Sequence, residues 1–102
     1  MQELTFRYPA TKPPVARAHV GVVASGDLEI VVMPAAGTGA ATVTLRTSVD
    51  GFDTIWRRVL DRHFTGSALE ADYEINDFGA TPGMVTLRLA QAREILDERD
   101  AL

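Results

Sequence analysis

Apolar and polar residues alternate along several short stretches of this chain, and that period of two is typical of β-strands with one buried face. Near the start, Leu4, Phe6 and Tyr8 are separated by polar residues, which predicts a strand over about 2–8. Residues 41–46 alternate in the same way and predict another strand. A sheet is therefore the framework on which the rest of the chain has to pack.

The clearest local prediction is a hairpin in the first third of the chain. Two runs rich in β-branched residues, 17–24 and 28–33, flank Ser25, Gly26 and Asp27. Serine, glycine and aspartate favour turns, so these three residues predict a tight connection between two strands. The hydroxyl of Ser25 would then lie at the exposed tip of the hairpin.

One segment, residues 52–65, has a helical period instead. Its apolar residues recur at the three- and four-residue spacing of an amphipathic helix, with Asp50 placed to cap the start and Gly66 to end it. We expect this helix to lie on the sheet. The stripe consists of Phe52, Ile55, Trp56, Val59, Leu60, His63 and Phe64.

The last third of the chain predicts a second hairpin and a short helix. Residues 73–75 and 85–89 alternate like strands, and the loop 77–83 between them is rich in turn formers. Residues 92–96 are weakly amphipathic. Together these segments predict a single α+β domain over residues 1–102: a mostly antiparallel sheet of about six strands, one long amphipathic helix packed on it and a short C-terminal helix.

The charge balance limits the partners of this chain. Ten Lys and Arg residues against fourteen Asp and Glu residues give a net charge of -4. Such a chain repels a phosphate backbone or an anionic membrane surface, so we expect neither nucleic acid nor membrane as a partner. The sequence starts without a basic segment followed by an apolar one, and no apolar run approaches the ~20 residues that span a bilayer. We therefore expect a cytoplasmic protein.

The residues do not form a self-contained catalytic site. There is no cysteine, which excludes a nucleophilic thiol within this chain. His19 precedes Ser25 by six residues on one predicted strand, which separates them by roughly 20 Å and prevents a hydrogen bond. His63 belongs to the apolar stripe and is expected to be packed. Two histidines without cysteines make a poor metal site, so we expect no metal and no catalytic residue.

Three runs of residues carry a wider pattern. They are Gly21-Val22-Val23-Ala24-Ser25-Gly26-Asp27-Leu28-Glu29, Thr47-Ser48-Val49-Asp50 and Asp77-Phe78-Gly79-Ala80-Thr81-Pro82-Gly83. In this order, and in a chain of this length, they resemble the acyl-carrier (delta) subunit of malonate decarboxylase. The citrate lyase acyl carrier is a more distant look-alike. The resemblance spans most of the chain and includes Ser25.

The resemblance implies a carrier and not an enzyme. In the proteins that this chain resembles, the matching serine carries 2'-(5''-phosphoribosyl)-3'-dephospho-CoA through a phosphodiester, so Ser25 would be an attachment point. The thiol of that group would hold acetyl and malonyl as thioesters while malonate is decarboxylated to acetate and carbon dioxide. The implied partners are an acyl-carrier transferase (alpha) subunit, the beta and gamma decarboxylase subunits, and the transferase that attaches the group.

The residues around the tip allow two interpretations. Gly26, Asp27 and Glu29 either help the attaching enzyme to recognise the serine, or the two acids are solvated charges of an ordinary turn. The apolar residues on the second face of the hairpin either dock a partner subunit or are covered by the C-terminal helix. These residues are Val23, Val31 and Met33.

A second class of function also fits the residues. The chain alone is compatible with an unmodified protein-interaction or small-ligand-binding domain, in which the serine serves only the turn. The two hypotheses differ in whether Ser25 carries added mass.

Overall fold

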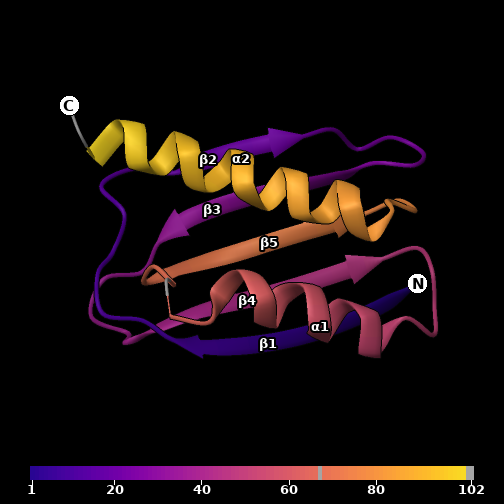
Figure 1. Ribbon diagram of the computed structural model, residues 1–102, viewed down its shortest axis with the longest axis horizontal. Helices are drawn as coiled ribbons and strands as arrows, with labels where there is room; N and C mark the ends of the chain where they lie inside the picture. Colours follow the sequence, from indigo (N-terminus) through magenta and orange to yellow (C-terminus); the bar gives the residue numbers. More distant parts are fainter. Residues whose placement is uncertain (67, 101–102) are drawn as a thin grey trace.

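A computed structural model describes residues 1–66 and 68–100. They form one five-stranded sheet and two helices (Figure 1). The strand order across the sheet is β1-β4-β5-β3-β2. The elements are β1 (Gln2–Pro9), β2 (Ala18–Gly21), β3 (Leu28–Pro34), β4 (Ala40–Thr47), α1 (Asp53–Phe64), β5 (Ala71–Asp77) and α2 (Pro82–Asp100).

The sheet is mixed. The pairs β1–β4, β2–β3 and β3–β5 are antiparallel, whereas β4 and β5 run parallel at its centre. Parallel neighbours need a crossover connection, and α1 supplies it between β4 and β5. The α+β class is therefore confirmed, while the prediction of about six strands is wrong, because the described residues contain five.

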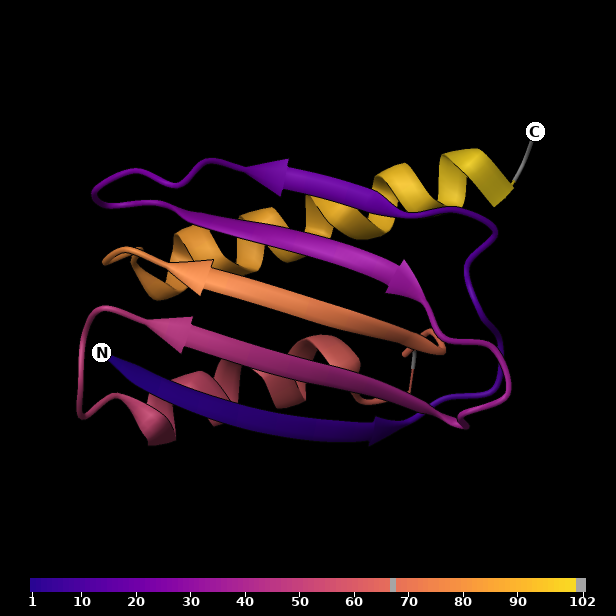
Figure 2. The same ribbon diagram turned by 180° about the vertical axis from the view of Figure 1, so that it is seen from behind.

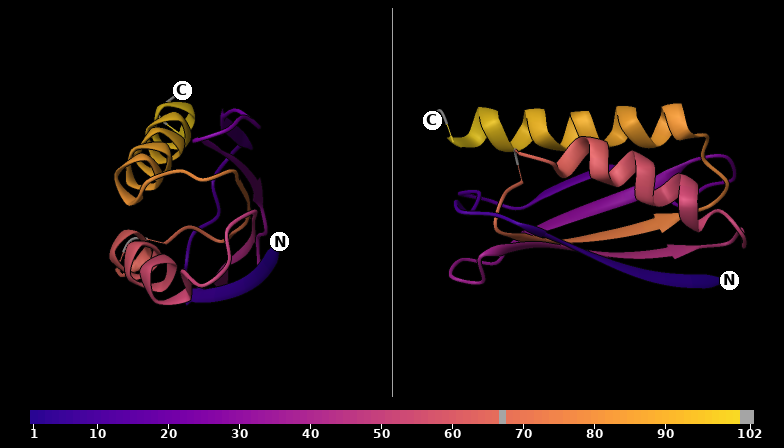
Figure 3. Two further views of the ribbon diagram at one scale, coloured as in Figure 1. Left: turned by 90° about the vertical axis from the view of Figure 1, so that its right-hand side faces the viewer. Right: turned by 60° about the horizontal axis from the view of Figure 1, so that its bottom comes forward.

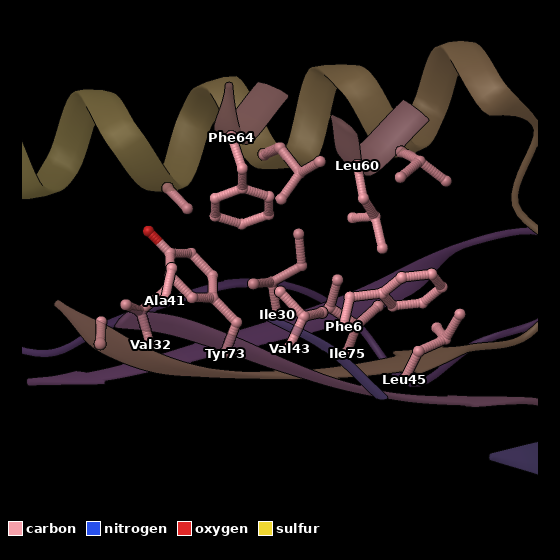
Figure 4. Packing of buried hydrophobic residues seen from close by; sticks show 14 of the residues in the cluster. Phe6, Ile30, Val32, Ala41, Val43, Leu45, Leu60, Phe64, Tyr73 and Ile75 are labelled. Carbon is pink, nitrogen blue, oxygen red and sulfur yellow. The ribbon is translucent and has the colours of Figure 1, made fainter. Parts of the chain in front are cut away.

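Both helices cover the same face of the sheet, and the other face is open to solvent (Figures 2 and 3). The core fills the space between the two layers. Leu60 and Phe64 of α1 point down onto the central strands, where Phe64 meets Tyr73 edge to face with ring centroids 4.8 Å apart (Figure 4). The interior residues of the central strands include Leu28, Ile30, Val32, Val43, Leu45 and Ile75, all fully buried.

The predicted helix over 52–65 is confirmed, but its start differs from the prediction. Phe52 is the first flanking residue and makes no side-chain cap, so Asp50 does not cap α1. At the other end, the amide and the hydroxyl of Thr65 both donate to the carbonyl of Asp61. Gly66 then takes a positive φ of 79°, as a glycine just beyond a helix end commonly does.

The C-terminal segment corrects the sequence analysis most strongly. The predicted strand over 85–89 and the short helix over 92–96 are both part of α2, which at 19 residues is longer than α1. Val85 and Leu89 are one helical turn apart and both are buried, whereas Leu87 between them is 48% exposed. Ala92 and Leu96 continue the same buried stripe.

The start of α2 explains why a helix forms there. Thr81 accepts a hydrogen bond from the amide of Met84 through its hydroxyl, at 3.2 Å, and from the amide of Val85 through its carbonyl, at 3.0 Å. Pro82 follows at the first helical position, which needs no amide hydrogen. The chain therefore enters a helix where the turn-rich loop was predicted to lead into a strand.

Candidate functional site

Ser25 lies in the connection between β2 and β3, residues 22–27, which we call the serine loop. The amide of Asp27 donates to the carbonyl of Ala24 at 3.1 Å, so Ser25 and Gly26 occupy the centre of a four-residue turn. Gly26 has a φ of 79°, a value that side chains other than glycine rarely accept. Ser25 is exposed, and within residues 1–66 and 68–100 its hydroxyl has no hydrogen-bond partner.

The predicted hairpin is confirmed, although its connection is longer than a tight turn. The strands separate after the pair Gly21–Glu29, so the residues from Val22 onward leave the sheet. Val22 and Val23 are 55% and 59% exposed and form an apolar surface close to the serine in sequence. Space around the tip is open, because nothing lies within 4 Å of a Cβ built on Gly26.

The backbone of the serine loop is fixed to the neighbouring loop 78–81. The amide of Gly26 donates to the carbonyl of Phe78 at 2.7 Å, and the amide of Phe78 donates to the carbonyl of Asp27 at 2.9 Å. These two bonds extend the pairing of β3 and β5 beyond its last register pair, Leu28 with Asp77. The turn around Ser25 is therefore fixed while its hydroxyl stays exposed.

Asp27 joins the serine loop to α2. The carboxylate accepts two hydrogen bonds from the Arg88 guanidinium, at 3.1 Å from Nε and 2.7 Å from Nη2, and a third from the amide of Leu28 at 2.7 Å. The hydrogen bond from Arg88 is the main cause that lowers the pKa of Asp27. The interpretation of Asp27 as a solvated turn charge is therefore wrong, since its side chain is 15% exposed and paired.

Glu29 is also engaged, on the open face of the sheet. It accepts a hydrogen bond from the side-chain amide of Asn76 at 2.9 Å, which is the main cause of its lowered pKa, and its other oxygen lies 3.0 Å from Nε2 of His19. His19 therefore contacts a carboxylate of the adjacent strand. Neither residue contacts Ser25.

Asp77, which the sequence analysis named only as part of a turn-rich run and without a role, supports the loops next to the serine loop. Its carboxylate, 3% exposed, accepts hydrogen bonds from the hydroxyl of Thr47 at 2.8 Å and the amide of Ala80 at 3.0 Å. Its carbonyl accepts a bond from the amide of Ser48 at 3.1 Å. Asp77 thereby fixes the two loops beside the serine loop.

The remaining candidate residues lie elsewhere. His63 is near the C-terminal end of α1, half-buried with its ring edge-on to Phe64 at a centroid distance of 4.8 Å, and burial lowers its pKa. The serine loop lies at the other end of the sheet, the end where α1 and α2 begin (Figure 1). Among the residues that the structure describes, no cluster of three or more histidine and acidic side chains could hold a metal.

Apolar residues on the second face of the hairpin remain accessible. Val31 and Met33 alternate along β3 with the buried residues Ile30 and Val32, so they lie on the face opposite the core, and Met33 is 41% exposed. The interpretation that the C-terminal helix covers them is therefore wrong. Their docking to a partner stays a prediction.

No described helix is long and apolar enough to cross a membrane.

The fold and this site define a class of protein: a small α+β scaffold that presents an exposed serine on a fixed turn, with no base hydrogen-bonded to its hydroxyl in the described chain. An unactivated hydroxyl is a weak nucleophile, so the described residues give Ser25 no support for nucleophilic catalysis.

Comparisons with known proteins specify the family. Residues 15–96 match the model of the malonate decarboxylase delta subunit (MdcD). The chain is 50% identical over 95 residues to the malonate decarboxylase acyl carrier protein of Pseudomonas aeruginosa strain UCBPP-PA14, covering 92% of this chain and 95% of that one. It is 45% identical over 95 residues to the acyl carrier protein of the same name from Pseudomonas fluorescens strain Pf0-1, with the same coverage.

A solved structure agrees with the sequence relatives. A chain in the crystal structure of a Pseudomonas malonate decarboxylase hetero-tetramer in complex with malonate superposes with a TM-score of 0.89 at 41% identity, covering 94% of this chain and 99% of that one. The chain belongs to the malonate decarboxylase delta-subunit family. It is a non-catalytic acyl-carrier subunit, as the resemblance of the three sequence runs implies.

Proposed function

We propose that this chain carries acetyl and malonyl thioesters during the decarboxylation of malonate to acetate and carbon dioxide, on 2'-(5''-phosphoribosyl)-3'-dephospho-CoA attached to Ser25. The observation that carries the proposal is the position of Ser25. It lies inside the segment that matches the family model, on an exposed turn, with a hydroxyl that no described residue engages.

The residues around Ser25 fit such an attachment. A phosphodiester to the serine oxygen needs a hydroxyl that another enzyme can approach, and the open space around Gly26 provides that approach. Because the chain has no cysteine, it owns no thiol on which to carry an acyl group. When bound, the group supplies that thiol, and the tether raises the local concentration of the acyl group at partner active sites.

The serine loop divides its tasks between neighbouring residues. The hydrogen bonds of Gly26 and Asp27 hold the backbone of the turn, so Ser25 keeps one position relative to the sheet. Val22 and Val23 leave an exposed apolar surface next to it. We assign to these two valines the contact with the enzyme that attaches the group, and to Asp27 the positioning of the loop.

The proposed partners follow from the family. One solved relative is part of a malonate decarboxylase hetero-tetramer. We propose that this chain likewise works in a cytoplasmic complex with an acyl-carrier transferase (alpha) subunit and the beta and gamma decarboxylase subunits. A separate transferase would attach the prosthetic group before the complex turns over malonate.

Intact-mass spectrometry tests the attachment. The chain is co-expressed with its decarboxylase subunits and the attaching enzyme, as wild type, as Ser25→Ala and as Ser48→Ala. Ser48 is a matched control, because it is an exposed serine at the same end of the sheet with its amide bonded to Asp77. We expect the mass of the prosthetic group on the wild type and on Ser48→Ala, and none on Ser25→Ala.

The same samples separate the carrier from the second candidate function. An unmodified interaction domain predicts no added mass on any of the three chains and undiminished malonate turnover with Ser25→Ala. Added mass that persists on Ser25→Ala would place the attachment elsewhere and contradict the proposal. Assembly of the complex, measured by size-exclusion chromatography, should be the same for all three chains.

A further inference from the structure

An apolar hollow of about 180 Å³ opens between the start of α1 and the start of α2, at the end of the sheet where the serine loop lies. Its volume is comparable with the ~150 Å³ of an engineered apolar cavity that binds benzene. Phe52 and Ile55, at the start of α1, are 45% and 39% exposed and belong to its wall. The lining residues are Val49, Phe52, Ile55, Trp56, Val59, Asp77, Gly79, Ala80, Pro82 and Val85.

The loop that forms part of the wall of this hollow is hydrogen-bonded to the serine loop. Gly79 lines the hollow, and a Cβ built on it would lie 3.9 Å from the amide nitrogen of Gly26. That same amide donates to the carbonyl of Phe78. The attachment point at Ser25 is therefore one residue from a backbone amide that adjoins the wall of the hollow, at the same end of the sheet.

The chemistry of the lining selects the occupant. Among the described residues that line it, Asp77 has the only ionisable side chain, and its carboxylate already accepts bonds from Thr47 and from the amides of Gly79 and Ala80. A second carboxylate placed here would meet this one without a basic side chain in the lining to offset it. The hollow therefore fits an uncharged, largely aliphatic group.

We propose that the hollow receives the aliphatic part of the arm tethered at Ser25, in its free-thiol or acetyl form, between visits to the partner active sites. This inference rests on the proposed function, since it needs a tethered group. The malonyl form has an additional carboxylate, which Asp77 disfavours, so that form stays outside and available to the decarboxylase subunits.

Trp56 provides a readout that does not depend on turnover. It is the single tryptophan of the chain, it lines the hollow and it is 6% exposed, so its emission senses what fills the hollow. The experiment compares the unmodified chain with the modified chain carrying a free thiol, acetyl or malonyl, each verified by intact mass. We expect the free-thiol and acetyl forms to shift the emission to shorter wavelength and to lose quenching by acrylamide, and the malonyl form to resemble the unmodified chain.

Two alanine variants sharpen the measurement. Ala80→Leu fills the hollow, whereas Ala90→Leu adds the same side chain at an exposed position of α2. The difference between modified and unmodified chains should vanish in Ala80→Leu and persist in Ala90→Leu. The wild-type comparison stands without either variant, should Ala80→Leu fail to fold.

The outcomes distinguish this inference from the function on which it rests. A chain that carries the added mass at Ser25, yet has the emission and quenching of the unmodified chain, overturns the inference and leaves the proposed function intact. Absence of added mass overturns both. If the Ser25→Ala chain shows the same shift of Trp56 emission when the partner subunits are added, the hollow is filled by a side chain of a partner. That result also overturns the inference.

Discussion

The two ends of the sheet use one device for different purposes. At the far end, which consists of the connections 10–17 and 35–39, the buried carboxylate of Glu70 accepts a hydrogen bond from the amide of Gly39 at 2.7 Å. At the serine end, which consists of the loops 22–27, 48–52 and 78–81, the carboxylates of Asp27 and Asp77 do the same work. At each end, acidic side chains thus hold the loops by accepting hydrogen bonds from backbone amides.

The two ends differ in the side chains that they expose to solvent. The backbone of Glu70 also accepts a bond from Ala35 and donates one to Lys12, so the far end closes inward on itself. At the serine end, Ser25 and its apolar neighbours Val22 and Val23 face solvent above an equally well-bonded backbone. A presenting loop needs an exposed serine on a fixed backbone, and the connections 10–17 and 35–39 contain no serine, although Val15 there is 62% exposed.

The largest expected loss of stability comes from substituting Gly21, the last residue of β2 before the serine loop. In Gly21→Ala, the new Cβ would meet the carbonyl oxygen of Leu28 at 2.0 Å, at a φ of 79°. Steric overlap and the unfavourable φ together should lower the free energy of unfolding by about 3 kcal/mol. Urea denaturation measures the loss.

A glycine at the far end provides the control. Gly37 has a φ of 83°, but nothing lies within 4 Å of a Cβ built on it. Gly37→Ala should therefore cost only the unfavourable φ, about 1 kcal/mol. Equal losses in the two variants would show that close packing under the serine loop is not what Gly21 provides.

The next effect concerns the carboxylate at the far end. Glu70→Ala removes the acceptor of the Gly39 amide while keeping the backbone bonds of residue 70, and should lower the free energy of unfolding by about 1 to 2 kcal/mol. The extent of Ser25 modification, measured by intact mass, should not change. Glu74→Ala is the matched control: Glu74 lies on β5, which begins just after Glu70, and its 3.3 Å pair with Arg46 is exposed, so its loss should cost less than about 1 kcal/mol. Reduced modification with Glu70→Ala would mean that the two ends are coupled.

The sequence indicated the serine hairpin because its signals are local. Turn residues between two β-branched runs are sufficient to place Ser25 at a tip. The bracing of that tip is not local: Arg88 lies 61 residues beyond Asp27, and pairing the two requires knowing that α2 crosses β2 and β3. The hollow likewise gathers residues from two stretches of the chain, 49–59 and 77–85.

The error in the last third has a specific physical cause. Val85 and Leu89 are four residues apart, a spacing that serves both a strand face and a helix face, and Leu87 between them completed an apparent alternation. Leu87 is in fact exposed. The Thr81-Pro82 pair was the signal that favoured a helix, since threonine caps and proline fits the first helical turn.

The smallest effect separates charge from shape at the serine end. Asp27 has a lowered pKa in the folded chain, so its ionised form contributes stability above the ordinary value of about 3.9 and loses that contribution as the pH falls through the lowered one. Asp27→Asn keeps the shape of the side chain and removes the charge that Arg88 pairs with. Urea denaturation at a series of pH values should therefore find the variant less stable than the wild type at pH 7, with the difference in unfolding free energy closing below about pH 4.

Asp50→Asn, at an exposed position of the same end, is the control. It should show no such difference, because the 3.8 Å contact of Asp50 with the amino terminus is screened by solvent. A gap that stays constant at low pH would mean that Asp27 holds the serine loop through geometry alone, and that its pairing with Arg88 is incidental to the presentation of Ser25.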